Sequence, residues 1–276
     1  MLNQLELKDI NRLEGIVGKV ILSHRHSTRQ VCIPLEKGGI FVAFHYCDIR
    51  KPLKNDEHVY ICAQPDKLYL VCDNKHIKEL FNTIEKDTPP YTAIIALLSL
   101  ITERDVEGLE KLEDSITSLE DRLITGKYPD RDTGNSIVRQ RNSLLKIKRY
   151  YEQLGIVTSD MLALTKDVLD PKQRAALKSV DRRLDHLLAS TLTLRDYTTQ
   201  VREAYQAQID IEQNQIMKIF TVITAVFLPQ SLIVGWYGMN FDMPEYLWRY
   251  GYVYVIILSI VTLLICIFIF KYKKWY

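Results

Sequence analysis

The stretch GWYGMNFDMPEYLWRYGY, residues 235–252, links the two longest uncharged runs of the sequence. No charged residue occurs from Ile219 to Met239 or from Gly251 to Phe270. Each run is about 20 residues long, and a helix of that length spans the roughly 30 Å hydrocarbon core of a bilayer. Buried helices of a soluble protein are the alternative. We expect two transmembrane helices, because two such runs are rare in a soluble chain of 276 residues.

The charges around the two runs predict their orientation. Three lysines lie in the tail KYKKWY, residues 271–276, directly after the second run, whereas the link holds only Arg249 against Asp242 and Glu245. Positive charge close to a membrane helix stays on the cytoplasmic side, so we expect both termini in the cytoplasm of a multi-pass cell-membrane protein. The N-terminal residues MLNQLELKDINRLEG lack a basic segment followed by an apolar one, and we expect no cleaved signal peptide.

The first third of the chain predicts a small α/β domain. Residues 16–73 alternate in the manner of β-strands in IVGKVILS, RQVCIPL, IFVAFHYC, HVYICA and LYLVCD, and a helix is expected over 75–86. This region holds no G-x-S-x-G, P-loop or dinucleotide motif, and we do not expect an enzyme. The formal net charge is only +2 and the charges are interleaved, which argues against nucleic-acid binding.

The five cysteines form no C-x-x-C pair, and an odd count in a cytoplasmic domain indicates reduced thiols. A zinc site made by His58, Cys62, Cys72 and His76 is an alternative, but its spacing matches no standard zinc pattern. We therefore expect cysteines in the core of the sheet.

The residues after Pro90 have a helical pattern. Apolar positions at three- and four-residue spacing predict one helix over 91–125 and a second over about 134–156. Residues 101–125 hold eight acids and three bases, whereas residues 131–150 hold six bases and one acid. A solvated helical hairpin explains this pattern, and an acidic surface that attracts cations is the alternative.

A long helix then begins at Asp170 and Pro171, which suit the cap and the first helical position. Its apolar seam recurs every three or four residues: Leu177, Val180, Leu184, Leu187, Thr191, Leu194, Thr198, Val201 and Tyr205. We expect this stalk to continue into the first transmembrane helix. The seven expected parts are an α/β domain (1–88), a helical hairpin (89–170), a stalk (171–217), a first transmembrane helix (218–238), an external loop (239–250), a second transmembrane helix (251–270) and a basic tail (271–276).

A stripe of polar, small and apolar residues follows the stalk into the first uncharged run. Its members are Asn214, Met217, Thr221, Thr224, Leu228, Ser231, Gly235 and Gly238. Nine residues separate Tyr205 from Asn214, about 900° at 100° per residue, so the stripe lies half a turn from the seam. We expect the lipid-facing positions to be Ile219, Val222, Ile223, Val226 and Ile233.

Such a stripe either allows close helix packing or lines an aqueous path. Steps of seven residues from Met217 reach Asp210, Glu203 and Asp196, and acids in line with the stripe favour a cation path. Two membrane helices per chain cannot enclose a pore. We therefore expect a cyclic oligomer in which copies of the first helix surround the path and the second helix faces lipid.

The segments YGMNF (237–241) and MPE (243–245), with Trp248 and GY (251–252), resemble the CorA family of magnesium and cobalt channels. The Gly-Met-Asn tripeptide at the outer end of the first of two C-terminal spans is the hallmark of that family. Further matches are NQIMK (214–218), FLPQS (227–231) and the basic tail. The specific match covers roughly residues 210–276, and the α/β domain followed by a stalk helix is similar as well.

The resemblance implies a funnel-shaped homopentamer that carries Mg²⁺, with Co²⁺ and possibly Ni²⁺ accepted, and binds no organic cofactor. Carried over by position, Asn240 and the Gly238 backbone form the outer selectivity ring and Asn214 lines the inner mouth. Met217 and Leu228 line the constriction. Phe220 stands where an aliphatic residue is usual in the family, and Ser231 keeps the hydroxyl of a more common threonine.

The resemblance also implies regulatory Mg²⁺ between cytoplasmic domains, for which Asp181, Asp185 and Asp196 are the candidates. Asp242 and Glu245 are expected to attract cations at the outer mouth. Mg²⁺ dehydrates reluctantly, and neutral amide oxygens can bind its water shell without trapping the ion. The alternatives are a zinc transporter of the same superfamily and a membrane-anchored coiled-coil sensor or scaffold without transport.

Overall fold

The computed structural model describes residues 2–7, 16–24, 30–35, 38–54, 57–125, 131–240 and 244–273. The chain forms two compact units, Met1–Ala204 and Tyr205–Tyr276. The first unit holds a β-sheet and most of the helices, and the second holds the end of the long helix α6 together with α7.

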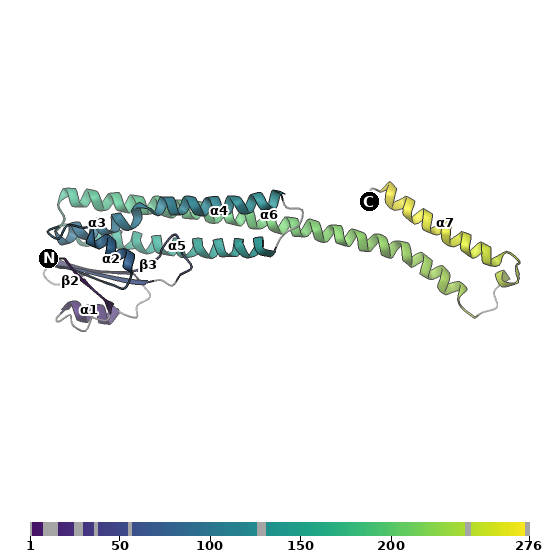
Figure 1. The fold of residues 1–276 in the computed structure, drawn as a ribbon, viewed down its shortest axis with the longest axis horizontal. Coiled ribbons are helices and arrows are strands. Elements are labelled where there is room, and N and C mark those ends of the chain that lie inside the picture. Colours follow the sequence, from purple (N-terminus) through teal and green to yellow (C-terminus); the bar gives the residue numbers. More distant parts are fainter. Residues whose placement is uncertain are drawn as a thin grey trace. The chain divides into compact units, whose positions relative to one another are not determined.

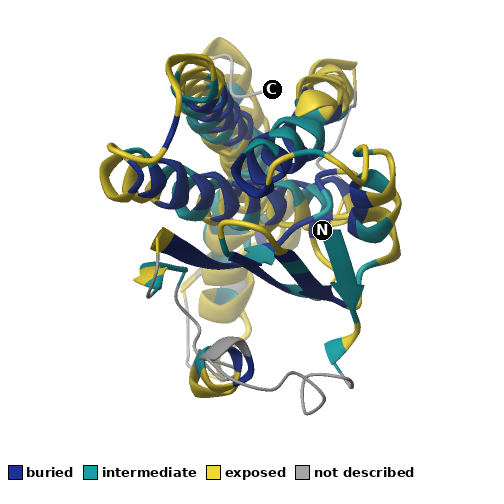
Figure 2. Cartoon of the chain, turned by 90° about the vertical axis from the view of Figure 1, so that its left-hand side faces the viewer, coloured by how far each residue is buried: buried dark blue, intermediate teal, exposed yellow. Residues whose placement is uncertain are grey.

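A five-stranded sheet organises the N-terminal part of the first unit. Its strands are β1 (Leu2–Leu5), β2 (Val31–Leu35), β3 (Gly39–Tyr46), β4 (Glu57–Ala63) and β5 (Leu68–Cys72), in the order β1-β5-β4-β3-β2. β1 pairs with β5 in parallel and the other pairs are antiparallel. Helices cover one face and α1 (Ile16–His24) lies on the other, so β3 is buried on both faces (Figure 2).

The sheet differs from the sequence analysis in two places, one wrong prediction and one missed strand. IVGKVILS forms the helix α1 rather than a strand, because Val20 and Ile21 both pack on the sheet, whereas neighbouring residues of a strand would point to opposite faces. β1 was not predicted, because a four-residue strand with two polar residues gives a weak signal. It is fixed by parallel pairing with β5.

The helices differ from expectation mainly at their ends. α2 spans Lys75–Asn82 and α5 spans Arg131–Leu164, longer than the predicted 134–156. The single helix expected over 91–125 is two helices, α3 (Pro90–Glu103) and α4 (Asp105–Thr125), with a break at Arg104. α3 is buried on most of its circumference, whereas α4 is buried along one stripe only. α4 also packs closely against Ile49, because a Cβ on Gly108 would lie 2.7 Å from Ile49 Cγ2. One straight helix could not be buried on most sides along its first part and on a single stripe along its second part.

The long helix α6 spans Pro171–Tyr237 and begins where the sequence predicts. Asp170 Oδ1 accepts a hydrogen bond from Gln173 N (2.7 Å), and Gln173 Oε1 accepts one from Asp170 N (3.0 Å). This reciprocal capping satisfies two backbone donors at the helix start. The seam from Leu177 to Val201 is buried, as predicted, where α6 runs beside α4 and α5 (Figure 1), and Tyr205 is half-buried.

The second unit contains the end of α6, a short 3-10 helix η3 (Pro244–Leu247) and α7 (Gly251–Tyr272). By length and composition, α6 and α7 each contain a stretch that could cross a membrane, and neither stretch is buried within the chain. Apolar side chains that a soluble protein would bury are exposed here, which favours a lipid surrounding.

Candidate cation path

α7 covers one face of α6 in the second unit. Within the uncharged run of α6, the half-buried positions follow one face of the helix: Val222, Ala225, Val226, Pro229, Gln230, Ile233 and Tyr237. Two hydrogen bonds join the helices, from Gln230 Nε2 to the Ser259 carbonyl (2.8 Å) and from Cys266 Sγ to the Ala225 carbonyl (3.9 Å).

This arrangement corrects part of the sequence prediction. Val222, Val226 and Ile233, expected to face lipid, lie on the face toward α7, whereas Ile219 and Ile223 are exposed as expected. The sequence reveals that these positions avoid polar groups, but an apolar position facing lipid looks the same as one facing a neighbouring apolar helix.

The predicted stripe lies on the opposite face of α6. At 100° per residue, its positions are centred about half a turn from those that contact α7. All eight members, Asn214, Met217, Thr221, Thr224, Leu228, Ser231, Gly235 and Gly238, are exposed or only partly covered in the single chain. The stripe is therefore free to face other copies of the chain or an aqueous path.

The two threonines of the stripe have oriented hydroxyl groups. Thr221 Oγ1 donates to the Met217 carbonyl and Thr224 Oγ1 donates to the Phe220 carbonyl, each at 2.8 Å. Because the hydroxyl hydrogen is engaged within the helix, the oxygen lone pairs remain as acceptors. Acceptors of this kind suit the water molecules around a hydrated cation.

Two apolar members of the stripe and the neighbouring Phe220 flank these threonines along α6. Met217, Phe220 and Leu228 are 56%, 61% and 65% exposed in the single chain. Brought together by symmetry, such side chains would form a constriction that loses its water when narrow.

Gly238 is required by the local backbone. A Cβ there would lie 2.8 Å from the Val234 carbonyl oxygen, closer than two such atoms approach, whereas a Cβ on Gly235 would meet nothing within 4 Å. α6 ends at Tyr237, so Asn240 follows the helix by three residues and is not its C-cap. Asn240 is exposed.

The predicted external acids stay predictions. Asp242 lies outside the described residues, and Glu245 belongs to η3 but its side chain is not described. Aromatic rings meet nearby, with Trp248 centred 6.4 Å from Tyr250 and 6.0 Å from Tyr254. Such amphipathic rings suit a membrane–water interface.

The predicted stalk acids Asp196, Glu203 and Asp210 all lie on the surface of the chain. Asp196 pairs with Arg195 (3.0 Å), and Asp210 accepts a hydrogen bond from Gln206 (3.1 Å). The ion pair offsets the charge of Asp196, so Glu203 and Asp210 are the better candidates for attracting cations.

The regulatory candidates do not form a metal site within one chain. Asp181 accepts a hydrogen bond from the Thr158 hydroxyl (2.5 Å), which directs it toward α5. Asp185 is exposed and shares a groove of about 660 Å³ with Asp160. Among the residues that the structure describes, no three His, Cys, Asp or Glu side chains gather closely enough to hold a metal.

Two of the three cysteines in the strands are core residues, as the sequence indicates, whereas Cys32 in β2 is half-buried. Cys62 and Cys72 are buried, and burial raises their pKa to about 12 and about 11. Both are neutral thiols at neutral pH, as expected for core residues. His58 instead lies against His45, with ring centroids 4.1 Å apart and ring planes tilted by 51°.

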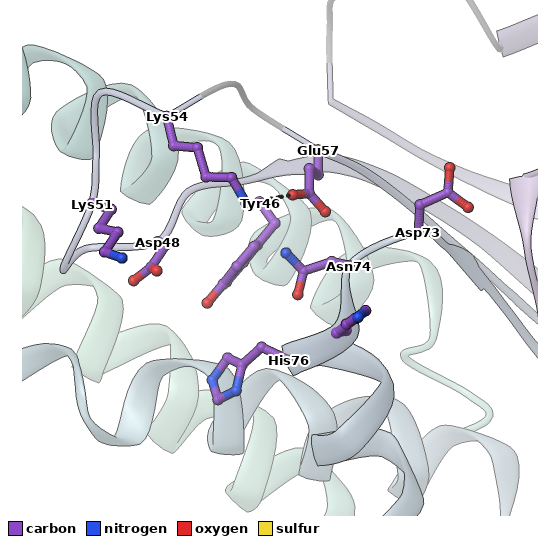
Figure 3. A pocket seen from close by; sticks show the side chains of 9 residues that line it. Tyr46, Asp48, Lys51, Lys54, Glu57, Asp73, Asn74 and His76 are labelled. Carbon is purple, nitrogen blue, oxygen red and sulfur yellow. Dashed lines mark ion pairs between the residues drawn. The ribbon is translucent and has the colours of Figure 1, made fainter.

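The first unit also has a charged cleft of about 430 Å³ that the sequence did not indicate (Figure 3). Lys54 pairs with Glu57 (3.5 Å), and the Asp73 carboxylate accepts a hydrogen bond from Leu7 N (3.1 Å). Three lysines and three carboxylates line the cleft: Lys51, Lys54, Lys75, Asp48, Glu57 and Asp73. Their formal charges cancel, so the cleft selects neither anions nor cations by charge.

A buried polar cluster lies where α3 gives way to α4. Burial raises the pKa of Asp105 to about 7, although a hydrogen bond from the Tyr151 hydroxyl (3.2 Å) partly opposes the shift. Tyr150 packs against Tyr151 and edge-on against Tyr46, and burial raises its pKa. Sequence reasoning missed this cluster, because only the fold brings β3 and α5 to the start of α4.

Gln230 and Cys266 were also missed. The available signal was the presence of an amide beside Pro229 inside an uncharged run, since polar side chains within a membrane are costly and usually have a partner.

Comparison with known proteins connects these features. The model of a family described as CorA-like Mg²⁺ transporter protein matches residues 4–274. A cobalt/magnesium transport protein CorA from Thermotoga maritima is 27% identical over 60% of this chain and 47% of its own length. One from Methanocaldococcus jannaschii is 32% identical over 65% of this chain and 56% of its own length. The matched part of the chain thus spans about half of these relatives.

The fold agrees with this match. The complete structure of the CorA magnesium transporter from Methanocaldococcus jannaschii superposes with a TM-score of 0.73 at 20% identity, covering 94% of this chain and 87% of that one. The α/β domain, the long helix and the two candidate membrane helices are thus a shared architecture.

Proposed function

Because the chain belongs to the family of CorA-like Mg²⁺ transporter proteins, we propose that it carries Mg²⁺, and also Co²⁺, into the cell as a homopentameric channel. The observation that carries this proposal is the stripe of α6, which lies on the face opposite α7 and leads to Gly238 and Asn240. The two relatives named as cobalt/magnesium transport proteins support the choice of ions.

The proposed path is enclosed by the stripes of five α6 helices, with α7 outside against lipid. A single pair of membrane helices cannot surround an ion, and cyclic symmetry brings identical stripes together around one axis. The accessibility of the stripe and the position of α7 on the other face support this arrangement.

Selection takes place at a ring of Asn240 side chains. Mg²⁺ holds its water shell tightly, so five carboxamides can bind the hydrated ion without stripping it. Gly238 supports the ring, because its missing side chain lets the backbone turn tightly past Val234. Below the ring, the Thr221 and Thr224 hydroxyls offer acceptors to the water around the ion.

Gating by internal Mg²⁺ completes the proposal. Each chain presents Asp185, Glu203 and Asp210 on its surface, and an interface between copies could unite acids that one chain keeps apart. Mg²⁺ bound there would hold the oligomer closed, and its loss would let the apolar constriction widen. Both termini lie in the cytoplasm in this arrangement.

The test is Mg²⁺ entry into liposomes that contain the purified full-length chain and a trapped fluorescent indicator. Wild type should admit Mg²⁺, and Asn240→Ala should lose most of this influx while the oligomer stays intact by light scattering. Thr262→Val is a control variant outside the stripe, because Thr262 lies on α7 and donates to its own helix at 2.8 Å, and it should keep the influx.

Each outcome has a different meaning. Equal influx in wild type and Asn240→Ala would remove Asn240 from the selective ring. Wild type that admits no Mg²⁺ or Co²⁺ at low internal Mg²⁺, but admits Zn²⁺, would replace the proposal with zinc transport. Wild type that admits none of these ions would favour a sensor or scaffold.

A further inference from the structure

Pro229 interrupts the hydrogen bonding of α6 within its membrane stretch. Proline has no backbone N–H, so the carbonyl four residues earlier, that of Ala225, loses its normal helical partner. In a hydrocarbon surrounding, no water replaces the missing bond, and an unsatisfied carbonyl is costly. This carbonyl therefore needs a donor from elsewhere in the protein.

α7 supplies that donor. Cys266 Sγ lies 3.9 Å from the Ala225 carbonyl oxygen, within the distance expected for a thiol donor. Beside the proline, Gln230 Nε2 donates to the Ser259 carbonyl at 2.8 Å, so a second bond runs from α6 to α7. One bond satisfies the group that Pro229 leaves unpaired, and the other holds the residue next to it.

The two bonds join the helices at different points of α7. Ser259 and Cys266 are seven residues apart, about two helical turns, and their partners on α6 lie on either side of Pro229. Two hydrogen bonds at different positions along the helices fix both the distance and the rotation of α7 relative to α6. A single hydrogen bond would leave the rotation free. The bonds thus restrain the part of α6 that proline frees to bend.

We propose that Cys266 and Gln230 form a clamp through which α7 holds α6 in one geometry at Pro229, where a backbone hydrogen bond is missing. This clamp sets how readily the cation path opens. The consequence for transport rests on the proposed function. Both side chains are positioning residues, because Gln230 lies on the face of α6 toward α7, Cys266 belongs to α7, and neither lies on the stripe. In this proposal α7 separates α6 from lipid, and it also affects the cation path by restraining how far α6 bends at Pro229.

The first experiment measures the clamp without transport. The thermal midpoint of the purified full-length oligomer is compared for Cys266→Val, which removes the donor, and Cys266→Ser, which keeps one. Both are repeated together with Pro229→Ala, where the restored N–H satisfies the Ala225 carbonyl. We expect Cys266→Val to lower the midpoint when Pro229 is present and to have little effect when it is combined with Pro229→Ala. An equal shift in both backgrounds would overturn the clamp.

The second experiment measures the initial rate of Mg²⁺ influx in liposomes. Cys266→Val and Gln230→Met should each change the rate by about two- to tenfold, the factor that corresponds to one hydrogen bond. Cys266→Ser should stay within about twofold of wild type, as should the control Ile267→Val, which changes an exposed position of α7. Rates unchanged in Cys266→Val and Gln230→Met would overturn the link between clamp and opening.

The two experiments separate the two proposals. Wild type that admits no divalent cation would overturn the proposed function, whereas the melting comparison still decides whether the clamp exists. Normal influx with no coupling between Pro229 and Cys266 would overturn the clamp and keep the channel.

Discussion

The two parts of α6 use the same spacing of residues for different purposes. From Leu177 to Val201 the three- and four-residue seam is buried within the first unit of a single chain. From Asn214 to Gly238 a stripe with the same spacing has no buried member. One chain therefore completes the core of the first unit, whereas the second unit exposes groups whose partners are lipid, water, ions or further copies.

The largest expected effect is on the stability of the first unit, which a substitution in the seam should lower and one in the stripe should not. Leu184→Ala should destabilise the first unit by about 2–5 kcal/mol, because it opens a cavity at a side chain that is 1% exposed. Leu228→Ala, at a stripe position, should leave the stability of the first unit within about 0.5 kcal/mol of wild type. Hydrogen exchange of the purified full-length chain measures both, and equal loss of protection in the first unit would break the comparison.

The next effect concerns glycines in the two regions. Gly238→Ala should reduce Mg²⁺ influx by about a hundredfold, because its Cβ would collide with the Val234 carbonyl and displace the ring that follows. Gly155→Ala is the matched control in α5, where an added Cβ meets nothing within 4 Å. Influx into liposomes should be unchanged in this control. Similar losses in both variants would indicate a general intolerance of alanine.

A pH effect should be confined to the first unit. The pKa of Asp105 is raised to about 7 from its usual 3.8, so its ionisation costs stability as the pH rises from about 4 through 7. Asp105→Asn removes this cost and can still accept the Tyr151 hydrogen bond. The variant should be more stable than wild type by about 1–3 kcal/mol at pH 8 and about equally stable at pH 4.

Chemical unfolding of both proteins at the two pH values measures this difference. A gap of the same size at pH 4 and pH 8 would show that ionisation of Asp105 is not its cause. A pH-dependent gap in the protection of α7 would mean that the effect is not confined to the first unit.

The smallest effect compares two threonines with the same hydrogen bond. Thr221→Val should lower Mg²⁺ influx by about two- to fivefold, because the stripe loses one acceptor for the water around the ion. Thr262→Val on α7 should change it by less than about 1.5-fold. Equal effects would assign the loss to helix packing, since both hydroxyls bond to their own helices in the same way.

Sequence periodicity predicted α6, the strands β2 to β5 and the helix α2, but it failed at α1, at β1 and at the break between α3 and α4, for a physical reason. The seam, the Asp170 cap and the stripe depend on local spacing along one helix, which the sequence records directly. The strand predicted at IVGKVILS is a helix, and the break at Arg104 divides one predicted helix into two. Both depend on which surfaces meet in three dimensions, and neighbouring residues do not encode that.

In the candidate cation path, too, the sequence predicts what depends on local spacing and not what depends on packing between helices. The members of the stripe could be identified from spacing, but the face covered by α7 could not, because lipid and a neighbouring helix are equally apolar. The roles of Gln230 and Cys266 required the structure, since their bonds span 29 and 41 residues.

The measurement that tests the central claim most directly is the water accessibility of the stripe. Single cysteines are placed at Thr224, on the stripe, and at Ile233, on the α7 side. The native cysteines are changed to serine, which keeps a donor at position 266. A cationic, membrane-impermeant thiol reagent is then applied to the oligomer in liposomes. We predict rapid reaction and loss of Mg²⁺ influx for Thr224→Cys, and slow reaction for Ile233→Cys. Equal reaction at both positions, or no reaction at Thr224→Cys in a conducting protein, would contradict a cation path along the stripe.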